Sequence, residues 1–153
     1  MRNVLIALVL VCVEFSFVGC ATSKDIDINA LNKDGSPVWT TTEPQAKNTI
    51  YGVGKAKLTI KSNSEMAAEA LSRADLAAKI QSTAKEYISY YSNDSVGLTA
   101  TAYEQLIMNI VNLAITDVRT EQTWEAKDGT VWVLVSISRK SIEGGIRSSN
   151  LHD

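Results

Sequence analysis

Cysteine and histidine are scarce in this chain, which has 153 residues but only two cysteines and one histidine. The single histidine, His152, is the second residue from the C-terminus. A Ser-His or Cys-His catalytic pair, or a zinc site built from cysteine and histidine, therefore cannot be assembled in the central part of the chain. The sequence predicts a protein that is not an enzyme and that holds no metal and no cofactor.

A basic excess is also absent, because 15 lysines and arginines face 17 aspartates and glutamates and the formal net charge is -2. Nucleic-acid-binding surfaces usually carry clustered positive charge. We therefore expect no nucleic-acid partner. Long apolar runs are missing as well, since the longest, Val4 to Val13, is too short to cross a bilayer as a permanent helix.

That short apolar run belongs to a pattern typical of an export leader, in which Arg2 precedes it and the small residue Gly19 and Cys20 end it. These last residues resemble bacterial lipoprotein leaders, in which a small residue precedes a cysteine that is acylated and becomes the new N-terminus. The resemblance implies a signal peptide over residues 1–19, cleaved between Gly19 and Cys20, with the lipid attached to Cys20.

Two residues depart from the lipoprotein pattern, since Phe17 stands where leucine is usual and Glu14 adds a charge. An ordinary secretory peptide, or a short anchor with an incidental cysteine, is the alternative interpretation. Cys12 lies inside the leader, so acylation would explain the one unpaired cysteine of the mature chain. Two or more acyl chains, such as palmitate, give stable attachment to a membrane. Ala21 resembles the outer-membrane sorting pattern, which implies attachment to the cell outer membrane on its periplasmic or surface face.

The remaining chain divides into three parts by composition. Residues 20–47 are rich in Asp, Asn, Lys, Ser and Thr and include Pro37 and Pro44, which predicts a lipidated cysteine followed by a flexible tether. Residues 48–140 are expected to form one small domain. Residues 141–153 contain Gly144 and Gly145 among polar residues, which predicts a disordered tail.

The predicted domain begins with a short strand over Ile50 to Ala56 that carries Gly52 and Gly54 on one face. Glycine inside a strand usually marks the close approach of another backbone, so we expect a helix against this face. The Gly-Val-Gly-Lys stretch lacks the spacing and the final hydroxyl residue of a phosphate-binding loop. Nucleotide binding is therefore not predicted.

Two helices are expected next. Ser62 and Glu65 have the spacing of a capping box and predict the start of a long helix. Its expected buried stripe, near helical period, consists of Met66, Ala67, Ala70, Leu71, Ala74, Ala77, Ala78, Ala84 and Ile88. After a break at residues 92–97, a second amphipathic segment carries Tyr103, Leu106, Ile107, Ile110 and Ala114 on one side.

The period then changes to two over residues 118–126 and 131–138, which are separated by a turn containing Asp128 and Gly129. This pattern is typical of a β-hairpin. The order strand, helix, helix, strand, strand predicts an α+β fold, in which two helices cover one face of an antiparallel sheet. Glu121 and Glu125 share a strand face and are expected to be solvated charges rather than an acid/base pair.

Several of these segments, in this order, resemble the Lpp-twenty family of bacterial envelope lipoproteins. The residues concerned are Pro37-Val38-Trp39, Tyr51 to Ala56, Ala70, Arg73, Ala74, Leu76 and Ala77 of the long helix, and the hairpin from Trp124 to Val135. The resemblance implies an envelope lipoprotein without known enzymatic activity. Some relatives build outer-membrane disks around the flagellar motor, so it also implies self-assembly.

Three functions therefore remain open. The first is a structural envelope lipoprotein that self-associates or docks with a larger outer-membrane or flagellar complex, through sheet edges or through Trp124 and Trp132. Core packing is the alternative role for these tryptophans. The second is a tethered module that binds cell-wall fragments or a small apolar ligand. The third is a surface adhesin or antigen. A calcium site built from carboxylates also stays open, although the Asp-x-Asp-x-Asp-Gly loop pattern is missing and Asp25-x-Asp27 lies in the predicted tether.

Overall fold

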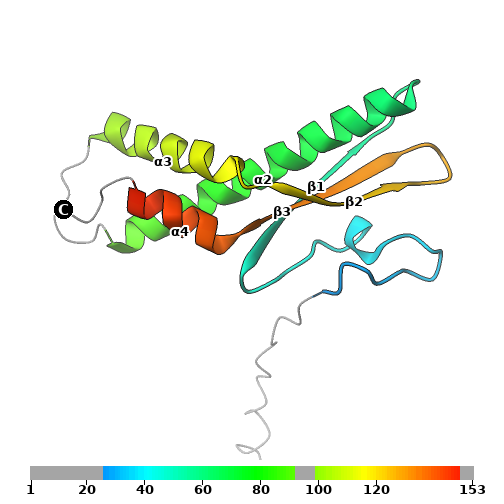
Figure 1. The fold of residues 1–153 in the computed structure, drawn as a ribbon, viewed down its shortest axis with the longest axis horizontal. Helices are drawn as coiled ribbons and strands as arrows, with labels where there is room; N and C mark the ends of the chain where they lie inside the picture. The colour runs from blue at the N-terminus through cyan, green and yellow to red at the C-terminus, as the bar shows by residue number, and fades with distance from the viewer. Residues whose placement is uncertain (1–25, 92–98, 149–153) are drawn as a thin grey trace, which may run out of the picture.

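The computed structural model describes residues 26–91 and 99–148, so Gly19, Cys20 and His152 lie outside the described residues. The predicted α+β fold is confirmed (Figure 1). In chain order the elements are η1 (Val38–Thr40), β1 (Thr49–Ala56), α2 (Lys61–Tyr91), α3 (Ala100–Ile115), β2 (Arg119–Glu125), β3 (Val131–Ser138) and α4 (Arg139–Ser148).

The three strands form one antiparallel sheet with the order β1-β3-β2. The hairpin of β2 and β3 turns at Gly129, whose φ of 83° favours glycine, as the Asp-Gly pair predicts. A register shift between Thr120 and Gln122 interrupts the regular alternation of β2. Beyond this bulge Gln122 is paired with Leu134, on the sheet face that points away from the helices.

Helix α2 lies directly on the glycine face of β1, as the sequence predicts. A Cβ atom added to Gly52 would come within 2.7 Å of Leu76 Cβ, and one added to Gly54 within 2.9 Å of the Leu71 carbonyl carbon. Real Cβ atoms essentially never approach this closely. The two glycines therefore let the backbone of α2 pack against the strand.

The predicted buried stripe of α2 is wrong except at Ala84 and Ile88. The helix begins at Lys61, and the hydroxyl of Ser64 rather than that of Ser62 accepts a 2.9 Å hydrogen bond at this end, from Leu58 N. The buried residues recur at every fourth position and are Ser64, Ala68, Ser72, Leu76, Ile80, Ala84 and Ile88. With 3.6 residues per turn, each step of four advances about 40° around the helix. The buried face thus turns from the sheet toward α3 and α4 along the helix (Figure 1).

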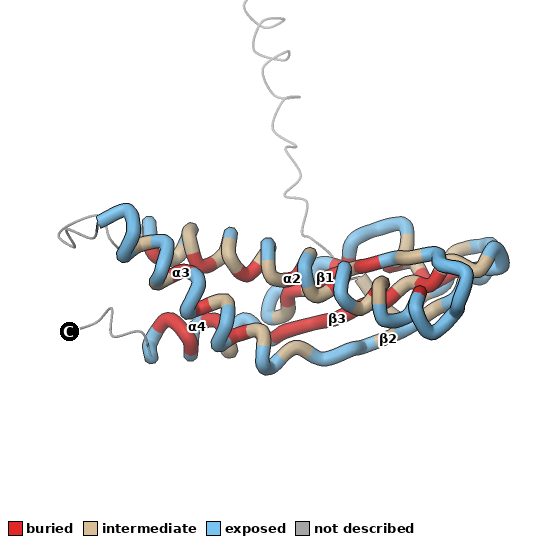
Figure 2. The backbone as a smooth tube through the Cα atoms, turned by 90° about the horizontal axis from the view of Figure 1, so that it is seen from above, coloured by how far each residue is buried: buried red, intermediate tan, exposed pale blue. Residues whose placement is uncertain are grey.

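Helix α3 buries Ile107, Ile110 and Ala114, as predicted. The predicted tail over residues 141–153 is wrong as far as residue 148, because this part is helical in α4 and buries Ile142 and Ile146. Two isoleucines four residues apart form an apolar stripe that the neighbouring glycines concealed. Figure 2 shows buried positions along β3 and on the helices at that end of the molecule.

Residues 26–47, here named the N-terminal strap, are packed against the domain and are not the flexible tether that their composition predicts. Trp39 is only 1% exposed, and a β-bridge between Leu31 and Pro37 closes a small loop. The strap covers part of the sheet face opposite the helices, where Leu134 is fully buried. The structured domain therefore extends over 26–148 within the described residues, rather than over 48–140.

Candidate functional site: a groove lined by Trp124 and Trp132

The N-terminal strap is fixed to the sheet by a pair of side-chain contacts. Trp39 Nε1 donates a 2.7 Å hydrogen bond to Gln122 Oε1, and Gln122 Nε2 donates a 3.1 Å bond to the Ile28 carbonyl. Gln122 is partnered with Leu134 on β3, which is in turn partnered with Val53 on β1. The strap therefore lies over the middle of the sheet.

The sheet face that points away from the helices is here named the outer face. The strap leaves this face uncovered at the next row of strand partners toward the β2–β3 turn. In this row Lys55, Trp132 and Trp124 are direct partners across the three strands. Side chains of directly opposed residues leave a sheet on the same face. All three line a groove of about 650 Å³, together with Asp34, Ser36, Thr40, Thr41, Ala56, Lys57, Ala126, Asp128 and Thr130.

The two tryptophans are each half-buried and lie outside the cluster of side chains between the sheet and the helices. The ammonium of Lys55 is 4.7 Å from the centroid of the Trp132 ring, which is within cation–π distance. Core packing against the helices, one of the two roles considered for these residues, therefore does not apply. Their use as a protein interface stays a prediction.

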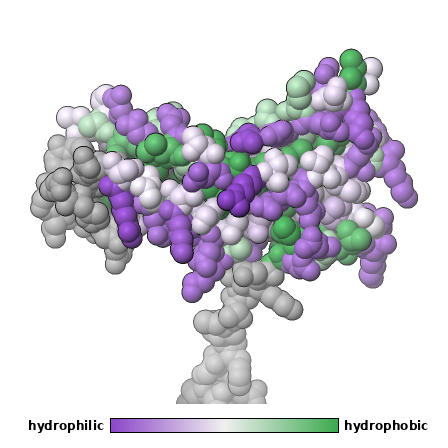
Figure 3. Space-filling view, viewed as in Figure 1, coloured by the Kyte–Doolittle hydropathy of each residue, from purple (hydrophilic) through white to green (hydrophobic). Residues whose placement is uncertain are grey.

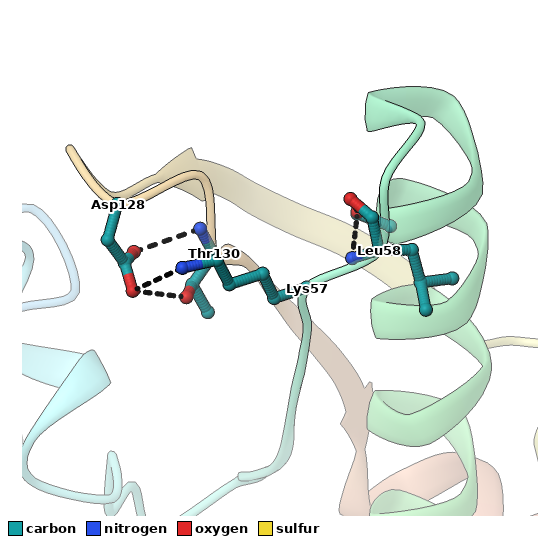
Figure 4. A network of polar contacts seen from close by, with 5 residues as sticks. Lys57, Leu58, Asp128 and Thr130 are labelled. Carbon is teal, nitrogen blue, oxygen red and sulfur yellow. Dashed lines mark hydrogen bonds and ion pairs between the residues drawn. The ribbon is translucent and has the colours of Figure 1, made fainter.

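Two carboxylates at the rim of the groove are held by neighbouring hydroxyl and amide groups. Asp128 accepts 3.0 Å hydrogen bonds from Thr130 N and Thr130 Oγ1 and faces Lys57 Nζ at 3.4 Å (Figure 4). Asp34 accepts bonds from Ser36 Oγ at 2.7 Å and Ser36 N at 3.0 Å. These bonds hold the pKa of Asp34 and that of Asp128 below the usual value, so both groups remain ionised near neutral pH.

Lys55 differs from Lys57 in its ionic partners. Among residues 26–91 and 99–148, no carboxylate lies within ion-pair distance of the Lys55 ammonium. Its positive charge is therefore available inside the groove. This charge lies over the face of the Trp132 indole, with Trp124 as the next residue of the same row, an arrangement that can hold a ring carrying an acidic group.

A second hollow, of about 620 Å³, lies at the other end of the outer sheet face and includes Arg119, Glu121 and Ser136 in its lining. The Ser136 hydroxyl donates a hydrogen bond to Glu121, while Glu125 forms a 2.6 Å ion pair with Lys61 at the start of α2. The two glutamates of β2 are thus engaged separately. Both are exposed, as the sequence predicts, but the prediction that they share a strand face is wrong. The register shift between Thr120 and Gln122 puts Glu121 beside Ser136 on the outer face, whereas Glu125 is opposite Val131 on the face that carries the helices.

The described residues contain neither a metal-ligand cluster nor a membrane-spanning helix. No group of three or more metal-ligating His, Cys, Asp or Glu side chains occurs within residues 26–91 and 99–148. No helix among these residues is long and apolar enough to cross a membrane. Cys20 and Gly19 fall outside them, so lipid attachment and leader cleavage stay predictions.

Sequence reasoning missed the residues that the strap and β1 contribute to this site. The composition of residues 20–47 predicts a tether for Asp34, Ser36, Thr40 and Thr41, and the sequence predicts Lys55 as part of a strand and not as a site residue. A usable signal was present in Trp39, because a lone tryptophan in a polar segment needs an apolar surface to cover.

The chain matches no protein-family model and no curated protein sequence. Among solved structures it is similar to the crystal structure of the secreted protein HP1454 from the human pathogen Helicobacter pylori. The two share 20% sequence identity with a TM-score of 0.36, and the match covers 67% of this chain and 35% of that chain. A likeness of this size carries no functional inference.

Proposed function

We propose that this chain is a lipid-anchored protein of the cell envelope, attached to the outer membrane, that self-associates in a structural or assembly role. The observation that carries the assembly role is an apolar stripe on the outward side of α2. Met66 is 65% exposed and Leu71 is 52% exposed, with Ala67, Ala70 and Ala74 beside them. Helical periodicity predicts that these residues are buried, but no other part of the described domain covers them.

The stripe is extended where β1 passes into α2, because Leu58 and Ile60 are also more than half exposed. Figure 3 shows hydrophobic surface among polar residues at this end of the molecule. Contiguous exposed apolar surface on a soluble domain commonly marks a protein interaction site. Small alanine side chains flanking Leu71 would let a second helix lie close to α2.

A second copy of the chain is a suitable partner for this surface. In a two-fold symmetric dimer the same patch serves both subunits, so it must be complementary to itself. An apolar stripe along a straight helix meets that condition, because an antiparallel copy presents the same residue types. We name this surface, defined by Met66, Ala67, Ala70, Leu71 and Ala74, the α2 stripe.

The lipid anchor is supported by the leader pattern that ends at Cys20. Only six residue steps separate Cys20 from Ile26, the first described residue, and a fully extended chain spans about 3.3–3.6 Å per residue. An acylated Cys20 would therefore hold the strap-covered face within about 20 Å of the membrane. The α2 stripe lies on the other side of the sheet, where the strap leaves it uncovered.

Mass spectrometry of the native protein tests the anchor. We expect the purified protein to begin at Cys20 and to carry acyl chains on its sulfur, and we expect it in the membrane fraction. A Cys20→Ser variant should lose both properties. An unmodified thiol, or native protein in the soluble fraction after cell breakage, would contradict the anchor.

Light scattering on the full-length protein in mild detergent tests the assembly. We expect a discrete oligomer whose mass falls when Leu71→Glu places a charge in the α2 stripe, with an unchanged melting temperature. Met108→Glu is the matched control, because Met108 is 49% exposed on α3 and lies outside the stripe. A monomeric wild type, or a Leu71→Glu variant with undiminished mass, would contradict this role.

A further inference from the structure

The groove beside Trp124 and Trp132 has the features of a ligand site that is separate from the α2 stripe. Neighbouring strands lie about 4.8 Å apart, so the two directly opposed indoles adjoin one another on the outer sheet face. Both indoles and Lys55 line the 650 Å³ groove. Flat apolar surfaces of this kind stack against planar or ring-shaped ligands.

The rim of the groove presents mainly hydrogen-bond acceptors. The hydroxyls of Thr40 and Thr41 donate to the carbonyls of Pro37 and Val38, at 2.8 Å and 3.0 Å. The Ser36 hydroxyl donates to Asp34 and the Thr130 hydroxyl to Asp128. Each hydroxyl proton is therefore already used, and the Ser36 and Thr41 oxygens also accept from Asn32 Nδ2 at 3.0 Å and 3.3 Å. The Thr40 and Thr130 hydroxyl oxygens and the two carboxylates are left to act as acceptors for a ligand.

Such a rim suits a ligand rich in hydroxyl and amide donors. Sugars supply both the donors and an apolar ring face that can lie on an indole, whereas an aliphatic ligand supplies no donors. A nucleic acid has rings as well, but its phosphates would need many cations and the chain carries a net charge of -2. A glycan is therefore the ligand class that matches the indoles and the acceptor rim together.

The charged side chains of the groove indicate that the glycan carries an acidic group. Both carboxylates at the rim are already hydrogen bonded, and Lys57 faces one of them. Lys55 is the lining cation whose ammonium rests on an indole instead of a carboxylate. A ligand ring that stacks on Trp132 would displace this flexible side chain, and the ammonium could then pair with an acidic group on the ligand.

We propose that this groove binds a carboxylate-bearing glycan of amino sugars, in which sugar rings stack on Trp124 and Trp132 and Lys55 pairs with the carboxylate. The proposal is independent of the anchoring and assembly described above. It assigns a ligand to the sheet face that carries the strap, while self-association would use the opposite side of the domain.

Isothermal titration calorimetry on the full-length protein in mild detergent tests the proposal with two tetrasaccharides. The acidic probe alternates N-acetylglucosamine and N-acetylmuramic acid, and the neutral probe is chitotetraose. We expect saturable binding of both probes, with the acidic one bound more tightly. We expect Trp132→Ala to weaken both about tenfold, since a stacked aromatic contact contributes on the order of that factor.

The Lys55→Met variant distinguishes the contribution of the lysine charge to glycan binding from that of stacking on the indoles. It changes only an exposed side chain. We expect it to weaken the acidic probe about tenfold and to leave chitotetraose unchanged. Lys140→Met is the matched control, because Lys140 is an exposed lysine at the start of α4 and should change neither affinity.

Three results would overturn the proposal. The first is no saturable binding of the acidic probe by the wild type at millimolar concentration. The second is equal affinity of wild type and Lys55→Met for the acidic probe. The third is a Trp124→Phe or Trp132→Ala variant with altered oligomer mass and unaltered glycan affinity, which would make the groove an interface between copies.

Discussion

Trp39 and Gln122, which are 83 residues apart in the sequence, are joined by a 2.7 Å hydrogen bond from the indole nitrogen to the side-chain oxygen. The bond connects the N-terminal strap to an edge strand of the sheet. Because the Gln122 amide nitrogen also donates to the Ile28 carbonyl, one side chain holds two points of the strap. Strap and sheet should therefore unfold together.

Substitution of Trp39 tests this coupling. Trp39→Phe keeps most of the buried ring but removes the donor to Gln122, and leaving this partly buried acceptor unpaired should cost about 1 kcal/mol, the lower end of the range for buried groups. Trp39→Ala should cost about 3–5 kcal/mol, as for other large buried side chains. Urea unfolding measures both losses. Trp132→Phe is the control, since this half-buried indole should lose less than about 1 kcal/mol, and equal losses in the two Phe variants would contradict the coupling.

Lys79 joins three parts of the fold. Its ammonium is 2.7 Å from Asp75 and 2.8 Å from Glu43 of the strap, and it donates a 2.9 Å hydrogen bond to the Tyr51 carbonyl of β1. Asp75 also accepts a 2.9 Å bond from Val53 N. Since β1 is an edge strand, these side chains cover backbone groups that would otherwise be open to another chain.

We expect Lys79→Met to lower stability at neutral pH by about 1–3 kcal/mol, because it leaves Asp75, Glu43 and the Tyr51 carbonyl without this donor. Burial lowers the pKa of Lys79, but the hydrogen bonds and charges of Asp75 and Glu43 outweigh it and raise the pKa above its usual 10.5. A lysine whose pKa is higher in the folded than in the unfolded state contributes its full stabilisation at pH values below the unfolded-state pKa. The difference from wild type should therefore shrink as the pH rises beyond about 10.5.

Denaturant unfolding of wild type and variant between pH 7 and pH 11 measures this difference. Lys85→Met is the matched control, because Lys85 and Glu104 form a more exposed pair at 3.6 Å on α2 and α3. Such a surface pair contributes less than about 1 kcal/mol. A Lys79→Met variant no less stable than Lys85→Met would show that the three-way contact does not hold the strap.

The sheet and its glycine contact with α2 could be predicted from the sequence because each depends on a short local pattern. Asp128-Gly129 fixes a turn between two alternating segments, and Gly52 with Gly54 leaves space on one strand face. Helix α3 could also be predicted, because its large apolar residues lie on a single stripe.

The buried face of α2 could not be predicted because alanine occurs all round the helix. Met66 and Leu71 favoured one side, whereas the domain buries the side with Ser64 and Ser72. Ser72 is accommodated there because its hydroxyl donates a 2.8 Å hydrogen bond to the Glu69 carbonyl of its own helix. Near the glycines of β1 the close approach of the two backbones favours small side chains, so Ala68 and Ser72 face the sheet there.

The groove escaped prediction for a different reason. Trp124 and Trp132 were identified as interface candidates, but their partners in the groove come from the strap and from β1. Residues 26–47 contain few large apolar side chains, so composition alone predicts a flexible segment. Trp39 supplies the contact that composition underestimates, since a single buried indole removes a large apolar area from water.

Asp128 should make the hairpin turn sensitive to acid. The hydrogen bonds from Thr130 N and Oγ1 lower the pKa of this carboxyl, with a further contribution from Lys57. An aspartate whose pKa is lower in the folded state contributes its full stabilisation at pH values above its unfolded-state pKa, which is near 3.8. This contribution is lost as the pH falls through the folded-state pKa.

We expect Asp128→Asn to be less stable than wild type at pH 7 and to approach wild type below about pH 4. Thermal unfolding over this pH range measures the difference. Asp117→Asn is the control, because Asp117 is exposed at the end of α3. A gap between Asp128→Asn and wild type that is constant from pH 7 to pH 3 would show that the carboxylate charge does not stabilise the turn.

Gly54 is the position where the fold tolerates a side chain least. A Cβ atom there would overlap the Ser72 amide nitrogen and the Ala68 carbonyl oxygen and would lie 2.9 Å from the Leu71 carbonyl carbon. These are backbone atoms of α2, which cannot turn aside as a flexible side chain could. We expect Gly54→Ala to cost about 3 kcal/mol, the upper part of the range for overpacked sites, as measured by urea unfolding.

Gly144→Ala is the opposite case and serves as the control. Within α4, a Cβ atom at this position would meet no heavy atom within 4 Å. Replacing a glycine inside a helix by alanine should raise stability by about 0.5–1 kcal/mol. If Gly54→Ala unfolded at the same urea concentration as wild type while Gly144→Ala was stabilised, the close packing of α2 on β1 would be refuted, because an added methyl group cannot fit between two backbones in contact.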